Sequence, residues 1–270
     1  MLENGKRLLL IKTRYKLLFY NLGVFAASGG GILHTAYAKH DKRPDWIPVD
    51  IAINLMCVLA WRIGTQTIVP NTPRVIPIYN CTSGSTSSLL YWPELQSIGI
   101  KMLRKHPMEH KIWYPSTKIN HYRIVDRLCR VFLHWIPAYC VDAFFYVLGK
   151  KHYSLVKITE KMTSAMDTVE YFVSREWSWN TQNVTNLHNM LSYEDHFRYN
   201  FSTKDFKDWD GYIEQYALGI RKFLMKSDPS TLESCRKNMW KFYAVHSTFK
   251  ICALFMVYIF IYLIWIFIVH

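Results

Sequence analysis

The sequence predicts three consecutive parts: an α/β portion that ends at about residue 100, a mostly α-helical region, and one C-terminal transmembrane helix. Between residues 75 and 95, an apolar run, a Thr-Ser-Gly turn and a helix-like run follow one another. That order is typical of the last units of an α/β sheet. Beyond residue 100, apolar residues recur at steps of three and four, which indicates helices. The last part is an uncharged run of 19 residues, Ile251 to Val269.

The first 22 residues contain basic residues and leucines but no uninterrupted apolar core. Because this core is missing, a secretory signal is not expected. Two interpretations stay open for this segment: a basic amphipathic segment, or sequence unrelated to the fold.

The α/β portion is expected to contain two helices and a strand. One helix is predicted from about Asp50, as its N-cap, to Arg62, with Gly64 just past its end. The run from Val75 predicts a short buried strand, and a second helix follows with Ser87 or Ser88 as its cap.

The region after residue 100 is expected to be helical. Pro137 to Leu148 predicts a helix with Pro in its first turn and Gly149 after its end. Apolar residues mark one face of a further helix; they are Leu155, Ile158, Met162, Met166, Val169 and Phe172. The run from Ser227 to Ser230, "SDPS", separates two more helices.

The C-terminal run Ile251 to Val269 has no charge, no Gly and no Pro. At 1.5 Å per residue it is roughly 28 Å long, close to the hydrocarbon thickness of a bilayer. A core helix would normally show a polar edge, and this run has none. Lysines precede the run and only His270 follows it, so the positive-inside rule places the main body in the cytosol.

The net charge of the 270 residues is +13, which favours an anionic partner such as a membrane surface or a phosphorylated ligand. A solvated basic surface is the alternative. The basic residues are spread out without a zinc-finger or RNP-like pattern, so no nucleic-acid partner is expected. The six cysteines form no C-x-x-C pair and no His cluster has zinc spacing, so no metal site is predicted and free thiols are expected.

Six stretches carry a resemblance to a known family. They are "IPVDIAIN" at 47–54, "IYNCTSG" at 78–84, "WYP" at 113–115, "HWIPAYCVD" at 134–142, "REWSWNTQNVTNLHNMLSYED" at 175–195 and "DWDGYIEQYALGIRKFLMKSDPSTL" at 208–232. In the last and most specific stretch, Asp208, Trp209, Tyr212, Gly219 and Arg221 match a D-W-x-x-Y…G-x-R pattern. From about residue 23 onward the chain resembles the C-terminal part of an alcohol-forming fatty acyl-CoA reductase of the insect type.

The resemblance implies a division of the chain. Residues 1–22 are unmatched, and 23–100 would be the last units of an NADPH-binding, Rossmann-type domain of the extended short-chain dehydrogenase class. Residues 101–246 would be the helical domain named for male-sterility proteins, followed by the transmembrane helix at 251–269. The endoplasmic reticulum and the peroxisome both fit such an anchor.

The family reduces a long-chain acyl-CoA through an aldehyde to a primary alcohol with two NADPH. The resemblance therefore implies an oxidoreductase of fatty alcohol biosynthesis. The alternative is a non-catalytic, membrane-anchored, lipid-associated protein derived from that family.

The chemistry needs a phosphate cradle of the T-G-x-x-G-F-x-G kind at a helix N-terminus, and a Tyr with a Lys four residues later. Gly29, Gly30 and Gly31 are consecutive rather than spaced, so we expect a turn leading into a helix, where glycine permits close backbone approach. A Y-x-x-x-K pattern, at Tyr153 and Lys157, falls in the helical region and is interpreted as chance. The sequence thus predicts no catalytic, cofactor-binding or metal residue, and this chain is not expected to bind NADPH tightly.

Other polar residues are assigned structural roles. Asp208, like Asp50, is expected to be a helix N-cap. His134 and Asp142 are eight positions apart, too far to form a pair on one helix, and Pro137 argues against a continuous helix between them. The apolar residues at helical steps from Trp209 to Ile220 are expected to be core rather than a lipid-binding stripe.

Overall fold

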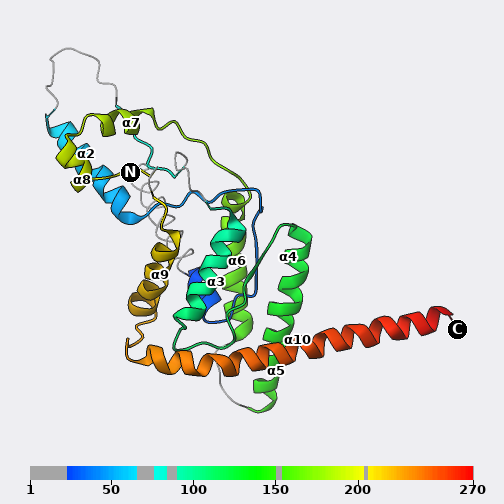
Figure 1. The fold of residues 1–270 in the computed structure, drawn as a ribbon. Helices are drawn as coiled ribbons and strands as arrows, with labels where there is room; N and C mark the ends of the chain where they lie inside the picture. Colours follow the sequence, from blue (N-terminus) through cyan, green and yellow to red (C-terminus); the bar gives the residue numbers. More distant parts are fainter. Residues whose placement is uncertain (1–22, 66–75, 84–89, 150–153, 204–205, 270) are drawn as a thin grey trace, which may run out of the picture.

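The computed structural model describes residues 23–65, 76–83, 90–149, 154–203 and 206–269. In this part of the chain, helices surround a small parallel sheet, and one long helix projects away from the body (Figure 1). The elements, in chain order, are β1 (Thr35–Tyr37), α2 (Val49–Thr65), α3 (Trp92–Lys105), β2 (Lys118–Asn120), α4 (Arg123–Arg130), the π-helical turn η1 (Val131–Trp135), α5 (Ile136–Val147), α6 (Leu155–Val173), α7 (Gln182–Asn189), α8 (Tyr193–Arg198), α9 (Trp209–Gly219), the π-helical turn η2 (Ile220–Leu224) and α10 (Thr231–Val269).

The sheet pairs β1 with β2 in parallel, with Ala36 opposite Ile119. Parallel strands require a crossover connection, and here α2 and α3 lie within it. Helices α4 and α6 contact β1, while α3 contacts β2. The structure is therefore mostly helical, with a small parallel sheet and a C-terminal apolar helix. However, β2 lies beyond residue 100, where only helices were expected.

The two helices of the crossover begin at different signals. Helix α2 starts at Val49, so Asp50 lies in its first turn, where a negative charge is favourable, and Gly64 lies inside the helix. The predictions of Asp50 as the N-cap and of Gly64 beyond the end are thus wrong by one turn or less. Helix α3 begins after Tyr91, whose backbone N–H donates to the Glu94 carboxylate at 2.8 Å. The proposed caps Ser87 and Ser88 lie outside the described residues.

The run predicted as a buried strand from Val75 is not a strand in its described part, residues 76–83. Ile76 and Ile78 are 84% and 69% exposed. Pro77 lies between them and lacks the N–H that a sheet ladder needs, which accounts for the error. Side-chain amides hold the segment instead: Asn183 donates to the Ile78 carbonyl at 2.8 Å.

The three glycines end a helix and lead into β1, so the prediction that they lead into a helix is wrong. The expected close backbone approach is confirmed. Gly31 has φ +71°, and a Cβ there would lie 2.2 Å from the Trp113 carbonyl oxygen. A Cβ on Gly29 would lie 2.9 Å from the Leu103 side chain.

Helices α4 and α5 form one continuous rod through η1, contrary to the expected interruption at Pro137. Pro137 lies in the first turn of α5, as predicted. The π turn directly before it accommodates the missing N–H of the proline. Gly149 follows the end of the rod with φ +62°. Helix α6 then packs antiparallel on α5, and Met166 of its predicted apolar face is buried.

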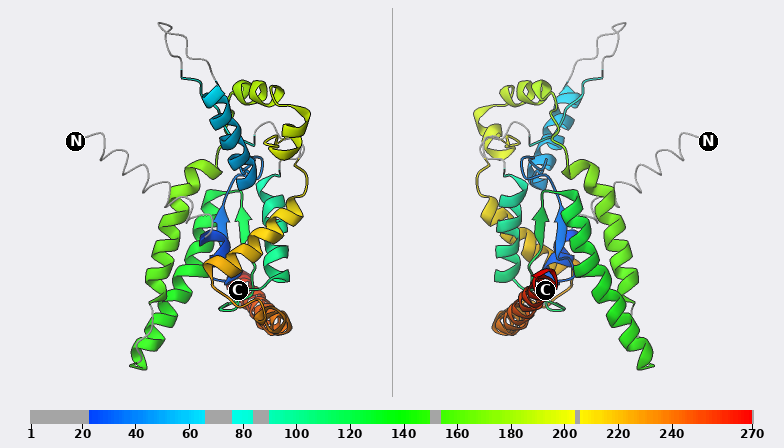
Figure 2. Two further views of the ribbon diagram at one scale, coloured as in Figure 1. Left: turned by 90° about the vertical axis from the view of Figure 1, so that its left-hand side faces the viewer. Right: turned by 90° about the vertical axis from the view of Figure 1, so that its right-hand side faces the viewer.

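Two groups of apolar side chains form the core. One joins α3 and α9, and includes Leu103, Ile213 and Ile220, with Tyr212 and Tyr216 packed against it. The predicted core role of the α9 residues is therefore confirmed, and burial raises the pKa of Tyr216 to about 12. The other group joins α2 and α7; its buried members are Ile51, Leu55, Val58, Leu187 and Phe201. The second group lies at the far end of the body from α10 (Figure 2).

Candidate membrane interface

The outer half of α10 projects from the body and is apolar on all sides. Helix α10 contains the predicted run Ile251–Val269 whole. Most of its described side chains from Ile251 to Phe267 are exposed, including Leu254 at 71% and Phe260 at 65%. A uniformly apolar surface without a protein partner in the structure is what a hydrocarbon environment selects. The helix thus fits membrane anchoring.

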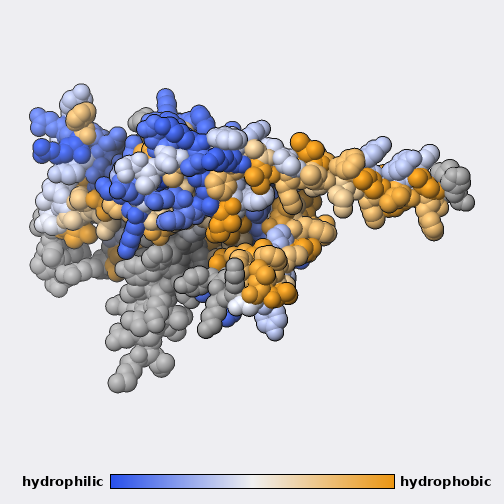
Figure 3. Space-filling model, turned by 90° about the horizontal axis from the view of Figure 1, so that it is seen from below, coloured by the Kyte–Doolittle hydropathy of each residue, from blue (hydrophilic) through white to orange (hydrophobic). Residues whose placement is uncertain are grey.

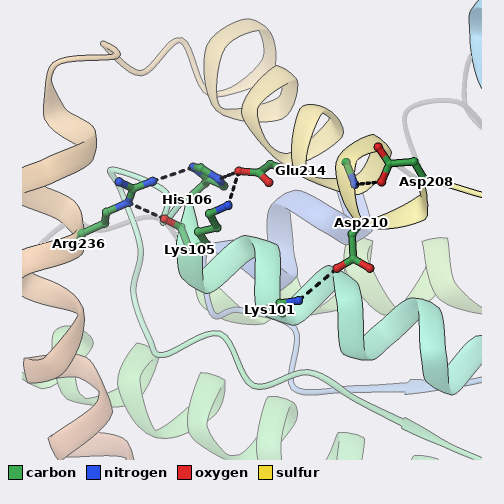
Figure 4. A network of polar contacts seen from close by, with 8 residues as sticks. Lys101, Lys105, His106, Asp208, Asp210, Glu214 and Arg236 are labelled. Carbon is green, nitrogen blue, oxygen red and sulfur yellow. Dashed lines mark hydrogen bonds and ion pairs between the residues drawn. The ribbon is translucent and has the colours of Figure 1, made fainter.

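The inner half of α10 is joined to the body by a polar network (Figure 4). Arg236 on α10 donates through Nε to the Lys105 carbonyl at 2.7 Å, and its Nη2 lies 3.2 Å from His106 Nδ1. His106 Nε2 and Lys105 Nζ lie 2.6 and 2.7 Å from the same Glu214 oxygen of α9. Lys105 first, and His106 second, lower the pKa of Glu214. Three helices, α3, α9 and α10, therefore meet at one polar network.

The N-cap of α9 lies in the same view. The Asp208 carboxylate accepts a hydrogen bond from the Gly211 N–H at 2.9 Å, which confirms the predicted cap (Figure 4). Asp210 in the first turn pairs with Lys101 of α3 at 3.2 Å. Since both of these groups are well exposed, this pair contributes little to stability.

Aromatic side chains fasten α10 on its other flank. Trp113 donates through Nε1 to His246 Nδ1 at 2.8 Å, and its ring meets Phe249 edge-to-face at 5.9 Å. Tyr114 packs against Tyr243 at 5.4 Å. The helix is therefore held up to Phe249, one residue before Lys250 and the apolar run. The direction of the anchor is set by the body rather than by a flexible linker.

The rod formed by α4, η1 and α5 turns polar residues toward the sheet. Asp126 is 1% exposed; it accepts a hydrogen bond from Thr35 Oγ1 at 2.7 Å and lies 2.7 Å from Arg130 Nε. His134 accepts one from the His34 N–H at 2.9 Å. Burial lowers the pKa of His34 to about 4, so that ring is neutral at pH 7. Asp142, farther along the rod, accepts from Leu155 N and Ser154 Oγ of α6. His134 and Asp142 therefore do not pair with each other, which agrees with the expectation from the sequence. Each has a structural partner elsewhere.

Replacing Asp126 with Asn should destabilise the fold by about 3 kcal/mol, because a buried Arg130 would lose its buried counter-charge. The matched control is Asp167→Asn. Asp167 also pairs with Arg130, at 2.6 Å, but is 57% exposed, so its loss should cost under about 1 kcal/mol. Denaturant unfolding followed by circular dichroism in detergent gives both values. Equal small losses would show that the buried pair does not hold the rod on the sheet.

The three consecutive glycines and the Y-x-x-x-K pattern do not form a cofactor site among the described residues. The backbone at Gly31 packs directly on Trp113, and Gly29 packs on Leu103 and Met108, so the turn leaves no room for a pyrophosphate. It also follows a helix rather than beginning one, which removes the N-terminal dipole that binds phosphate. The residues present do not fit NADPH at this turn. Lys157 is exposed in the first turn of α6, and Tyr153 lies outside the described residues.

A cavity of about 220 Å³ lies between α2 and α7, and it was not anticipated from the sequence. Its lining includes Leu55, Val184, His188, Phe201 and Cys81. Burial, and secondarily Asp45, raises the pKa of the Cys81 thiol. The thiol is therefore protonated at neutral pH and is a poor nucleophile. Within the described ranges, no cluster of three His, Cys, Asp or Glu side chains could hold a metal ion.

The fold is a helical body with a C-terminal apolar helix that fits membrane anchoring. Residues 133–227, from the rod to the end of α9 and η2, match the family "Sterile: Male sterility protein". The chain is also 33% identical over 219 residues to fatty acyl-CoA reductase 1 of Homo sapiens, and 32% identical to that of Gallus gallus; each match covers 81% of this chain and 41% of the relative. Fatty acyl-CoA reductase 2 of Bos taurus is 27% identical over 235 residues, covering 87% of this chain and 44% of that relative.

The chain is therefore a relative of the fatty acyl-CoA reductases, as its sequence motifs indicated. It spans about two fifths of the length of the curated relatives that it matches.

Proposed function

We propose that this chain is the membrane-bound helical part of a fatty acyl-CoA reductase, which converts a long-chain acyl-CoA to a primary alcohol. The observation that carries the proposal is the match to reductases 1 over 81% of the chain, together with the male-sterility family match at residues 133–227. The proposed reaction uses two NADPH: one hydride reduces the thioester to an aldehyde and releases CoA, and the second reduces the aldehyde to the alcohol.

The nucleotide cradle and the catalytic Tyr–Lys pair are assigned to the part of such a reductase that this chain does not span. In this proposal, residues 23–100 are the last units of the Rossmann-type domain and residues 101–246 are the helical domain. Strand β1 of the first part pairs in parallel with β2, which lies beyond residue 100, around a helical crossover; this α/β unit supports an α/β origin for the part that contains β1. The direct packing of α9 on α3 supports a helical part that rests on the α/β part.

The proposal places the body on the cytosolic side of the endoplasmic reticulum or peroxisomal membrane, with α10 as a single-pass anchor. The lysines that precede the apolar run support this orientation. A body at the membrane surface would hold the reductase where acyl chains and fatty alcohols partition.

The test is fatty alcohol formation by a chimera in which this chain replaces the matching part of human fatty acyl-CoA reductase 1. Alcohol formation that depends on NADPH would support the proposal. A chimera that is folded and membrane-bound but inactive, beside an active parent enzyme, would favour the non-catalytic lipid-associated alternative.

A further inference from the structure

The rod α4–η1–α5 has its polarity reversed relative to a helix of a soluble protein. The residues at every fourth position along one line, Asp126, Arg130, His134 and Ala138, are buried against the body, and three of the four are polar. On the opposite line the side chains are apolar and exposed; they are Ile124 at 74%, Leu128 at 54%, Phe132 at 63% and Ile136 at 45%. Water disfavours such a surface, and contiguous exposed apolar patches mark binding faces.

Further apolar residues broaden this face along the rod. Their exposed members are Val125, Val131, Leu133, Tyr139, Phe144, Tyr146 and Val147. The rod is, with α10, one of two described helices that are long and apolar enough to cross a membrane. Crossing would require the buried Asp126 and Arg130 to leave β1 and enter hydrocarbon, which is costly. The contacts of the polar line therefore argue for a helix that lies on a membrane rather than through it.

The position of the rod relative to α10 supports the same placement. In Figure 1 the rod runs crosswise to α10, at the level at which α10 leaves the body. Figure 2 shows α10 nearly end-on while the rod runs across the view. A bilayer crossed by the outer half of α10 would therefore run alongside the rod. Figure 3 shows apolar residues along α10, with hydrophilic residues gathered on the part of the body farther from its end.

We propose that the apolar face of α4–η1–α5 lies in the boundary between headgroups and acyl chains of the same membrane that α10 enters. This inference rests on the proposed anchor and adds a second, surface-parallel contact to it. Tyr139 and Tyr146, 58% and 85% exposed, are suited to that depth because their rings are apolar and their hydroxyls can reach water. The occupant of the face is lipid, continuous with the lipid around α10.

The experiment is photolabelling of the full chain in phosphatidylcholine vesicles that contain a phosphatidylcholine with a diazirine near the top of one acyl chain. Labelled residues are mapped by mass spectrometry. Label is expected on the outer half of α10 and on Ile124, Leu128 and Phe132, but not on Met56, an exposed apolar residue of α2 at 64%. Phe132→Asp should lower the label on the rod several-fold and leave that on α10 unchanged. The matched variant Met56→Asp should change neither.

The outcomes separate the two contacts. Label on α10 alone, or crosslinks from the rod to a second copy of the chain, would overturn the inference and leave the anchor standing. Label on the rod without label on α10 would overturn the anchor but retain the face as a lipid contact. A second lipid with its diazirine at the end of the acyl chain tests depth. Strong label along the whole rod from that deep position would mean that the rod crosses the membrane and would overturn the flat placement.

Discussion

The chain expressed as written should form no fatty alcohol above background from a long-chain acyl-CoA and NADPH. The turn at Gly29 to Gly31 is filled by Trp113, Leu103 and Met108, so it cannot cradle a pyrophosphate. Loss of a single preorganised donor to the developing oxyanion costs on the order of 100-fold or more in rate. Without a pyrophosphate cradle at this turn as well, turnover should fall to the level of the uncatalysed reaction. The measurement is alcohol formation by gas chromatography, with NADPH consumption in parallel.

The control for this result is Tyr153→Phe, which removes the tyrosine hydroxyl of the Y-x-x-x-K pattern at Tyr153 and Lys157. Because that pattern is interpreted as chance, the substitution should leave alcohol formation unchanged, both by the chain alone and by the active chimera. Robust turnover by the chain alone that Tyr153→Phe abolishes would mean that this Tyr is catalytic. In that case the assignment of the catalytic pair to sequence outside this chain would be wrong.

Deleting residues 251–270 should move the chain from the carbonate-resistant membrane pellet to the supernatant. The deletion removes the apolar run but keeps Arg236, His246 and Phe249, which hold the inner half of α10 on the body. A smaller change is the double substitution Leu254→Lys and Ile261→Lys in the full chain. Each Lys near the centre of a membrane helix costs about 2.5–3.5 kcal/mol on insertion scales, so the pair should also release the chain.

The matched control substitutes Lys for Trp240 and Val245, exposed residues on the inner half of the same helix. These positions lie before the apolar run, so the control chain should stay in the pellet. Full retention of the deleted chain under carbonate would show that another segment anchors the protein and that α10 is dispensable.

Local signals predicted the elements whose formation depends on neighbouring residues. The apolar run within α10, the Asp208 cap, Pro137 in the first turn of α5 and the turn after Ser227 all lie where the sequence placed them. In each case the determining chemistry, a charge-free run, a capping carboxylate or a proline, lies within one or two turns of the element that it shapes.

Long-range contacts decided the elements that the sequence did not reveal. Strands β1 and β2 are three residues each and 80 residues apart, too short to show alternation. Ile76 and Ile78 are apolar enough for a buried strand, but Pro77 and the amide of Asn183 keep them outside any sheet in the described part of the chain. From the sequence alone, Asp126 would be expected to face solvent. Its contact with Thr35 shows that the line of polar residues along the rod is the buried one.

The orientation of the body tests the account most directly, and it is measured in intact endoplasmic reticulum microsomes with added protease. The account predicts that the body is digested from outside, and that Asn183 carries no glycan although it begins an N-x-T triplet. Its side-chain amide, which donates to the Ile78 carbonyl, should therefore stay unmodified. A body that is protected from protease and glycosylated at Asn183 would place it in the lumen and contradict a cytosolic body anchored by α10.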